Sequence, residues 1–305
     1  MPIAIAYITV ILIWGTTPLA IRWSAAEVDL WLAIAIRMII GLVLSYLWLR
    51  LRGGRMSWDP DAMKLYTVSL LGTVGAMYAV YWSSRYIASG LISVLFGLAP
   101  ILGGAYALIL LAERFFTWRR VLSALIALLG LLFIFRRELD LGNEGWKGVL
   151  GILVAVNCYA LSAVLVKRLG LTHSALVVNT GSLAMSVLVL IPAWLLSGAQ
   201  LPQQMDLRSM GAILYLGVFG SFVGFVLYYY ILQRLSVGST MFVTLVTPLI
   251  ALYLGSSLAG EVVDLYALIG SALVLTGLLV YMWPAAIELF QVLRKRFYVS
   301  HPWLT

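Results

Sequence analysis

Charged residues are scarce in this chain, and their scarcity decides its class. Only 10% of the 305 residues are charged while 63% are hydrophobic, and the mean hydropathy is +1.03. Soluble domains carry about a quarter charged residues, so a soluble globule is excluded. Apolar runs of about 20 residues match a hydrocarbon core roughly 30 Å thick and exclude the shorter alternating segments of a β-barrel. The sequence therefore predicts an all-α membrane protein.

Residues that carry chemistry are also rare. The single cysteine, Cys158, excludes an intramolecular disulfide. The two histidines, His173 and His301, lie outside the predicted spans, so there is no histidine metal cluster and no base beside a membrane-embedded serine. The stretch that begins at Gly255 lacks the second glycine of a nucleophile elbow. A membrane-embedded enzyme is the competing class, and these absences disfavour it; we expect no catalytic residue, metal or cofactor.

The apolar runs are separated by charged or glycine-rich breaks. They predict ten transmembrane helices, at roughly 3–22, 30–50, 65–86, 88–111, 119–136, 146–166, 174–196, 211–233, 238–259 and 264–283. The first run has no basic residues before it and no small-residue cleavage site, so we expect it to be retained as a span. Residues 285–305 are predicted to form a cytoplasmic tail with a short amphipathic helix that carries Arg294, Lys295 and Arg296.

Basic residues collect at the ends of the predicted helices. With the N-terminus inside, 13 Lys and Arg residues fall in cytoplasmic segments and six fall outside, which favours two cytoplasmic termini. Topology therefore explains the net charge of +8 better than a nucleic-acid partner does.

Two segments, Gly90–Glu113 and Gly238–Glu261, repeat one pattern 148 residues apart. Each has a proline ten residues in, Pro100 or Pro248, and each ends on a glutamate. The same offset gives further identities: Gly72 with Gly220, Tyr81 with Tyr229, and Leu110 with Leu258. Ten helices and this offset divide the chain into two five-helix halves, residues 1–138 and 144–283. Because each half has an odd number of spans, the second is inverted, as in many secondary transporters with a substrate site near the midplane.

The repeated prolines and glutamates have different expected roles. A proline inside a helix removes a hydrogen bond and bends it, so Pro100 and Pro248 are predicted kinks, either static or part of a gate; their matched positions favour a gate. Glu113 and Glu261 lie about 13 residues, hence roughly 20 Å, beyond their prolines. At that depth they are near the interface, and we expect structural helix-end roles in which they accept hydrogen bonds from the first amides of the following helix.

Arg37 is the basic residue that lies well inside a predicted span. Charge within a membrane is costly and points to function, and a guanidinium is suited to a substrate carboxylate or phosphate. The alternative is that Arg37 extends to the outer surface, which is about 10 Å away. Both interpretations stay open.

Aromatic and polar residues at mid-span are the remaining candidates. An offset of 145 pairs Trp14 with Tyr159 and Thr17 with Ser162 in the first helices of the two halves. Asn157 needs a hydrogen-bond partner on another helix or on a ligand at that depth. The predicted substrate-binding set is Trp14, Thr17, Arg37, Tyr78, Asn157 and Tyr159. Core packing is the competing interpretation of these residues, and the aromatic belt at the membrane interface explains Tyr81, Trp82, Tyr229 and Tyr230.

The order of these features resembles the drug/metabolite transporter superfamily, in its EamA-type ten-helix form. The resembling residues are Trp14-Gly15-Thr16-Thr17-Pro18-Leu19-Ala20-Ile21-Arg22, Arg37, Pro100, Ala112-Glu113, Pro248, Gly260-Glu261 and Gly277. The resemblance implies a central cavity lined by the first, third, fourth, sixth, eighth and ninth helices, and export of amino acids, aromatic or hydrophobic ones included. Ala112 departs from the glycine usual before the first glutamate, so helix contact there is expected to be less close.

The sequence thus predicts an inner-membrane, multi-pass secondary transporter that exports amino acids or related small metabolites by alternating access. Its expected partners are a small-molecule substrate and the lipid bilayer, with no nucleic acid, and it is expected to be a monomer or homodimer. The alternative within transport is a multidrug or cationic-compound exporter. That chemistry usually needs an acidic residue at mid-membrane, and the central parts of the predicted spans have none.

Overall fold

The computed structural model describes residues 2–111, 118–140, 144–170, 172–202, 204–241, 243–261, 265–266, 268–277 and 279–280, and within these ranges it is helical without strands. Eight helical segments are long and apolar enough to cross a membrane. Two shorter apolar helices, Leu122–Ile134 and Leu268–Gly277, stand where the fifth and tenth spans are predicted. The described part of the chain therefore has the all-α architecture and the ten-span order expected from the sequence, while Glu113 and the predicted amphipathic tail lie outside it.

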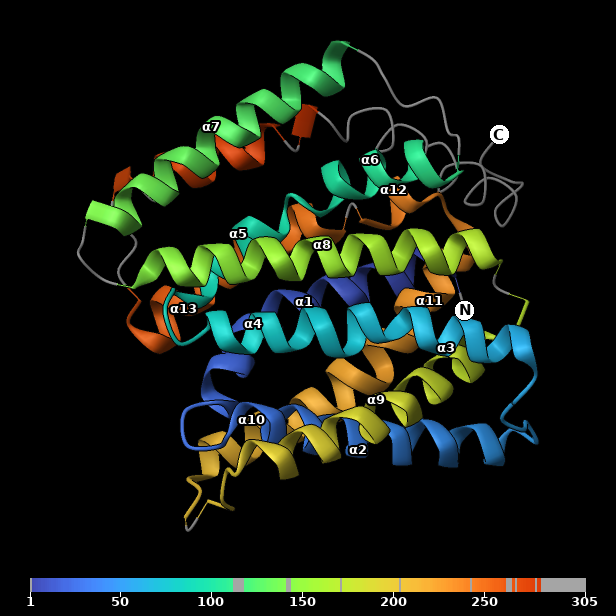
Figure 1. Ribbon diagram of the computed structural model, residues 1–305. Coiled ribbons are helices and arrows are strands. Elements are labelled where there is room, and N and C mark those ends of the chain that lie inside the picture. Colours follow the sequence, from blue (N-terminus) through green and yellow to red (C-terminus); the bar gives the residue numbers. More distant parts are fainter. Residues whose placement is uncertain are drawn as a thin grey trace, which may run out of the picture.

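The described residues of the first half form α-helices and the π-helix η1; Figure 1 labels the α-helices. In chain order these are α1 (Ile3–Ser24), α2 (Leu30–Leu51), α3 (Pro60–Leu70), η1 (Leu71–Ala76), α4 (Met77–Ser83), α5 (Ser89–Phe96), α6 (Ala99–Leu111) and α7 (Trp118–Asp140). The second half follows the same plan, with α8 (Gly145–Leu169), α9 (Ala175–Ser197), α10 (Leu207–Tyr215), η2 (Leu216–Gly224), α11 (Phe225–Arg234), α12 (Val237–Met241) and α13 (Val243–Ala259).

Side-chain caps set the start of several helices. Asp59 accepts hydrogen bonds from the amides of Asp61 and Ala62, and Pro60 occupies the first turn, where a proline lacks no needed donor. The third span therefore starts five residues before the predicted residue 65. Asp206 likewise caps α10, so the eighth span starts at Leu207 instead of residue 211.

Both halves interrupt their third span with a π-helix. η1 ends at Ala76 and η2 ends at Gly224, which is the same position at the offset of 148. A π-helix widens the helix and is frequent at functional sites. Sequence periodicity gave no signal for either segment, because the apolar pattern of a span does not distinguish an i→i+5 hydrogen-bond register from the α-helical one.

The fourth span is broken rather than kinked at its proline. α5 ends at Phe96, a turn covers Gly97 and Leu98, and Pro100 lies in the first turn of α6. A proline there removes no helical hydrogen bond, so the predicted kink at Pro100 is corrected to a break before it. Pro248 does lie inside its helix, α13.

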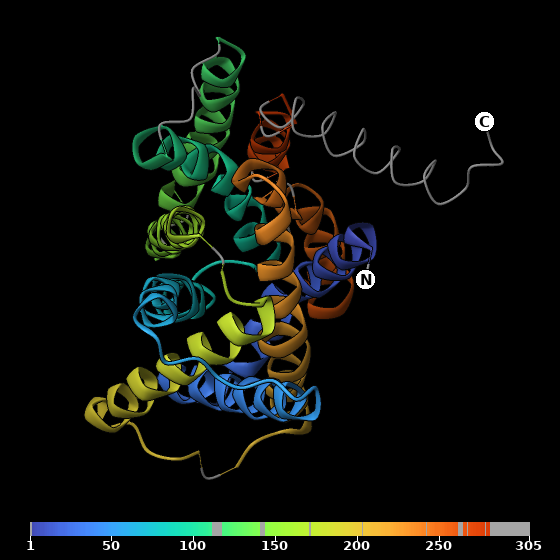
Figure 2. The ribbon, with the colours of Figure 1, turned by 90° about the vertical axis from the view of Figure 1, so that its right-hand side faces the viewer.

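Figures 1 and 2 show the helices packed side by side in one bundle. α2 packs on α9, α1 packs on α13, and α8 packs on both α6 and η1. α7 lies at the edge, beside the segment Leu268–Gly277 (Figure 1). A Cβ on Gly130 would come within 2.6 Å of the Gly270 carbonyl oxygen, so glycine permits this close helix contact.

Candidate functional site

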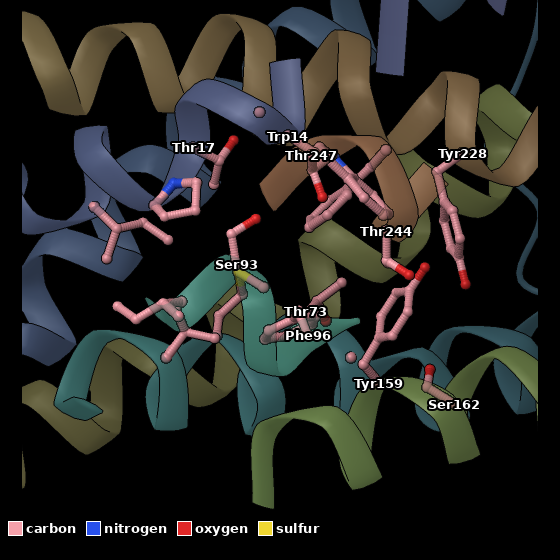
Figure 3. Close-up of a pocket in the computed structure, with 18 of the residues that line it drawn as sticks. Trp14, Thr17, Thr73, Ser93, Phe96, Tyr159, Ser162, Tyr228, Thr244 and Thr247 are labelled. Atoms are coloured by element: carbon pink, nitrogen blue, oxygen red, sulfur yellow. The ribbon is translucent and has the colours of Figure 1, made fainter. Parts of the chain in front are cut away.

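A cavity of about 100 Å³ lies at the centre of the bundle (Figure 3). Its residues come from α1, α2, η1, α4, α5, α8, η2, α11 and α13, hence from both halves. The side chains are mainly aromatic, aliphatic or hydroxyl-bearing, with one cation and no carboxylate: Trp14, Thr17, Pro18, Ile21, Arg37, Thr73, Met77, Val80, Ile92, Ser93, Phe96, Tyr159, Ser162, Phe225, Tyr228, Tyr229, Thr244 and Thr247, together with Gly72 and Gly220.

Matched positions of the two halves line this cavity together. Two pairs share the offset of 145, and four share the offset of 148: Trp14 with Tyr159, Thr17 with Ser162, Gly72 with Gly220, Met77 with Phe225, Val80 with Tyr228, and Phe96 with Thr244. Most residues that line the cavity therefore occupy positions related by the sequence repeat.

An aromatic cluster forms one wall. The ring centroids of Trp14 and Tyr159 are 5.8 Å apart in an edge-to-face arrangement, and those of Trp14 and Tyr228 are 5.3 Å apart. Phe96 adds a fourth ring, 5.9 Å from Tyr159. Such spacings are those of attractive aromatic pairs, and together they present an apolar surface to a ligand.

Arg37 supplies the cavity's cation. Its side chain is 1% exposed, and Nε donates a hydrogen bond of 3.0 Å to Ser221 Oγ at η2. No described carboxylate forms an ion pair with it. The guanidinium therefore does not extend to the surface, which was one of the two interpretations of the sequence. A buried charge without a counter-charge is costly, so this arrangement leaves Arg37 ready to pair with an anion.

Several hydroxyl groups of the lining already donate their protons to helix carbonyls. Thr17 donates to Ile13, Thr244 donates to Met241, and Ser162 donates to Val68, at 2.7, 2.8 and 3.0 Å. The lone pairs of these oxygens remain free to accept hydrogen bonds from a ligand. The wall beside the aromatic cluster is thus rich in acceptors (Figure 3).

Tyr159 has a hydroxyl group that is buried without a hydrogen-bond partner among the described residues. An unsatisfied buried hydroxyl costs about 1–3 kcal/mol. Because Tyr159 lines the cavity, a ligand can remove this cost by bonding to the hydroxyl.

Two predicted binding residues lie elsewhere. The ring of Tyr78 stacks on Trp31 with centroids 4.0 Å apart, and Tyr78 is not among the residues that line the cavity. Asn157 accepts a hydrogen bond from the Tyr106 hydroxyl at 2.8 Å and donates one to the Leu153 carbonyl. The Asn157 amide therefore has hydrogen-bond partners on α6 and within α8. These partners, rather than a ligand, account for a polar side chain at this depth.

Glu261 lies two residues beyond α13 and caps α5, a helix of the other half, while the residues that directly follow Glu261 lie outside the described ones. Its carboxylate accepts hydrogen bonds from the amide and hydroxyl of Ser89, both 3.0 Å, and from the Gly90 amide at 3.3 Å, at the start of α5 in the other half. It also pairs with Arg22. Sequence order gave no sign that α5 starts beside Glu261, so this partner was not predicted.

Sequence reasoning missed several residues of the cavity. Tyr229 was assigned to an aromatic belt, but its side chain is 4% exposed and lines the cavity. Tyr81, which was assigned to the same belt and does not line the cavity, is also buried, and its hydroxyl accepts a hydrogen bond from Ser24. Tyr81 and Tyr229 are paired at the offset of 148, and this pairing could have indicated buried positions. An aromatic belt at the interface does not require tyrosines at matched positions of the two halves.

A helical membrane bundle whose two halves enclose a small cavity of aromatic, hydroxyl and cationic side chains is the arrangement of a membrane transporter. The sequence profile of the EamA-like transporter family matches residues 1–136 and again residues 146–283. The chain therefore belongs to the EamA-like transporter family.

Known relatives share this class. An uncharacterized transporter of Archaeoglobus fulgidus is 27% identical over 272 residues, covering 87% of this chain and 93% of its own. The uncharacterized inner membrane transporter YedA of Escherichia coli K12 is 24% identical over 295 residues, covering 93% and 94%. A protein of Streptantibioticus cattleyicolor named a "probable terminal-alkyne amino-acid exporter" is 27% identical over 226 residues, covering 72% and 74%.

The fold also matches a solved crystal structure. The similarity has a TM-score of 0.69 at 18% sequence identity and covers 93% of this chain and 98% of the other. At that identity the match concerns the fold alone.

Proposed function

We propose that this protein is an inner-membrane secondary transporter that exports amino acids or closely related small metabolites by alternating access. The observation that carries the proposal is the buried Arg37 guanidinium, which faces the central cavity without a carboxylate partner among the described residues. A guanidinium binds a carboxylate through two parallel hydrogen bonds, so Arg37 is assigned to the substrate carboxylate.

The rest of the cavity suits the other parts of an amino acid. The free lone pairs of Thr17, Ser162 and Thr244 are acceptors for an ammonium group. The rings of Trp14 and Tyr228 provide an apolar wall for a hydrophobic or aromatic side chain. The name of the Streptantibioticus cattleyicolor relative supports the same substrate class.

The small size of the cavity supports alternating access. Its volume of about 100 Å³ is well below the roughly 300 Å³ at which ligand pockets begin. Substrate entry therefore requires the helices around the cavity to separate. Because the lining comes from both halves, rocking of one half against the other changes the size of the site.

A multidrug or cationic-compound exporter is the second candidate. An organic cation in this cavity would meet the Arg37 guanidinium, and no lining carboxylate is available to compensate it or to exchange a proton. Like-charge contact makes this candidate the weaker one.

The test is transport of a panel of labelled amino acids and of labelled organic cations into inverted membrane vesicles. We compare the wild type with Arg37→Gln and Trp14→Ala, and with Arg55→Gln as an exposed arginine control. Arg37→Gln is expected to lower transport of amino acids about 10–100-fold, which corresponds to the loss of hydrogen bonds to a charged group. Transport unaffected by either cavity variant would contradict the site assignment, and transport of cations alone would contradict the substrate class.

A further inference from the structure

A second cavity, which we call the lateral groove, lies outside the central site. Its volume is about 1100 Å³, and it is formed by the C-terminal end of α2, the N-terminal end of α9, and η2 with α11. η2 and α11 contribute residues to both sites. Phe222 and Val226 line the groove, whereas Gly220 and Phe225 line the central cavity. The groove and the cavity therefore flank the same span.

One part of the lateral groove is apolar. Phe222, Val223, Val226 and Leu227 are adjacent along η2 and α11, and Leu176 of α9 lines the same groove. All five side chains are partly exposed. An aliphatic chain covers such a surface favourably, because each buried methylene group contributes about 0.8 kcal/mol.

The other part carries two guanidinium groups. Arg52 lies over the Trp48 ring at 5.0 Å, and Arg234 lies over the Tyr230 ring at 3.7 Å. Neither arginine pairs with a carboxylate among the described residues. Stacking on the rings holds both cations at the groove. Arg234 Nη1 donates hydrogen bonds to the Tyr230 carbonyl at 3.1 Å and to Gln233 Oε1 at 3.4 Å, which leaves its Nε and Nη2 groups for an anion.

The histidine of the groove adds no free charge. His173 Nε2 lies 3.1 Å from Asp59 Oδ2. The pKa of Asp59 is lowered to about 2, first because Ser57 donates a hydrogen bond to it and then because the Ala62 amide and His173 also stabilise the anion. Asp59 is therefore ionised at neutral pH beside His173, and the groove lining itself carries Arg52 and Arg234 without a carboxylate.

We infer that the lateral groove binds an anionic phospholipid. Its phosphate bonds to Arg52 and Arg234, and one acyl chain lies along Phe222, Val226 and Leu227. The occupant is assigned by charge complementarity and by shape, because two unpaired guanidinium groups adjoin an apolar wall at the ends of membrane spans. Basic sites between transmembrane helices are suited to lipid phosphates, which accept bidentate hydrogen bonds from arginine. This inference is independent of the transported substrate.

The experiment measures lipid binding to purified protein by native mass spectrometry, with phosphatidylglycerol and phosphatidylcholine of identical acyl chains. The variants are Arg52→Gln/Arg234→Gln and, as a charge-matched control at the same end of α2, Arg50→Gln/Arg55→Gln. We expect the wild type to prefer phosphatidylglycerol, and the first double variant to bind it about 30-fold more weakly. Equal binding of the two lipids, or equal binding by the two double variants, would overturn the inference.

A second variant tests the groove without a change of charge. Val226→Trp fills the apolar wall and leaves both arginines, so it is expected to displace phosphatidylglycerol as strongly as the arginine variant does. A phosphatidylglycerol with a photoreactive group at the acyl terminus should crosslink to the segment 222–227. Crosslinking elsewhere, or displacement of the lipid by millimolar inorganic phosphate alone, would assign the two arginines to a soluble anion and reject the lipid.

Discussion

At the scale of single residues, the cavity combines near-symmetry with one strong exception. Aromatic and hydroxyl residues are paired between the halves, as Trp14 is with Tyr159 and Thr17 with Ser162. Arg37 has no such counterpart, since the offsets of 145 and 148 lead to Ser182 and Met185. A single cation in an otherwise matched lining gives the cavity one charged end, so a substrate with one carboxylate binds in one orientation.

Gly220 is predicted to position Arg37. A Cβ at Gly220 would lie 2.8 Å from Arg37 Nη2, so Gly220→Ala must displace the guanidinium, which is the flexible end of its side chain. We expect correct folding and transport reduced about 10–100-fold, because catalytic and binding groups displaced by about 1 Å lose that much. The control is Gly75→Ala in η1, where the added Cβ makes an ordinary 3.5 Å contact with Cys158. Thermal unfolding and vesicle transport of both variants check the prediction; similar transport losses in the two would contradict it.

Tyr159→Phe is predicted to separate stability from affinity. The hydroxyl has no partner among the described residues, so its removal should leave the melting temperature unchanged or higher. Substrate affinity should fall about threefold to tenfold, the size of one neutral hydrogen bond.

Tyr81→Phe is the matched control for that variant, because the Tyr81 hydroxyl accepts a hydrogen bond from Ser24 and Tyr81 does not line the cavity. Here stability should fall while affinity stays constant. A lower melting temperature for Tyr159→Phe than for Tyr81→Phe would show that the Tyr159 hydroxyl is bonded within the protein.

At the scale of elements, the broken and π-helical spans surround the cavity. η1 and η2 place Gly72 and Gly220 in the lining, and α5 ends at the break before Pro100 with its last residue, Phe96, at the cavity. The start of α5 is held by Glu261 from the other half. A carboxylate at a helix N-terminus satisfies unpaired amides and complements the positive end of the helix. Glu261 thus joins the two halves at one end of the molecule.

Glu261→Gln is predicted to destabilise the protein by about 2–3 kcal/mol, because charged hydrogen bonds in a nearly buried site are lost. Arg22→Gln should cost less, since Arg22 is 44% exposed and the α5 donors still compensate the carboxylate. The exposed pair of Lys64 and Asp61 is the control, and Lys64→Gln should change stability by less than about 1 kcal/mol. Chemical or thermal unfolding in detergent measures the stability of the three variants. A larger loss of stability for Arg22→Gln than for Glu261→Gln would show that the ion pair, and not the helix cap, provides the stabilisation.

At the scale of the whole molecule, the two halves contribute matched elements in the same order. The π-helices end at corresponding positions, Ala76 and Gly224, and the family profile matches each half separately. An odd number of spans in each half predicts opposite orientations in the membrane. The orientation itself, with both termini in the cytoplasm, rests on the distribution of Lys and Arg.

Single-cysteine labelling tests that topology. Cysteines introduced at Arg52 and Asp140, in a Cys158→Ser background, are predicted to react with an impermeant maleimide from opposite sides of the membrane. Arg52 should be labelled in inverted vesicles and Asp140 in intact cells. Labelling of both positions from one side would contradict the inverted arrangement.

The sequence by itself determined the membrane class, the order of ten spans, the two matched halves and part of the cavity lining, namely Trp14, Thr17, Arg37 and Tyr159. These follow from hydrophobic length and from rare residues that recur in register, which are local or one-dimensional properties. Tertiary structure decided that Arg37 is buried, that Asn157 bonds to Tyr106, that Tyr229 faces the cavity and that Glu261 caps α5. Each of these depends on which distant helix packs against the residue, and periodicity within a span carries no information on that neighbour.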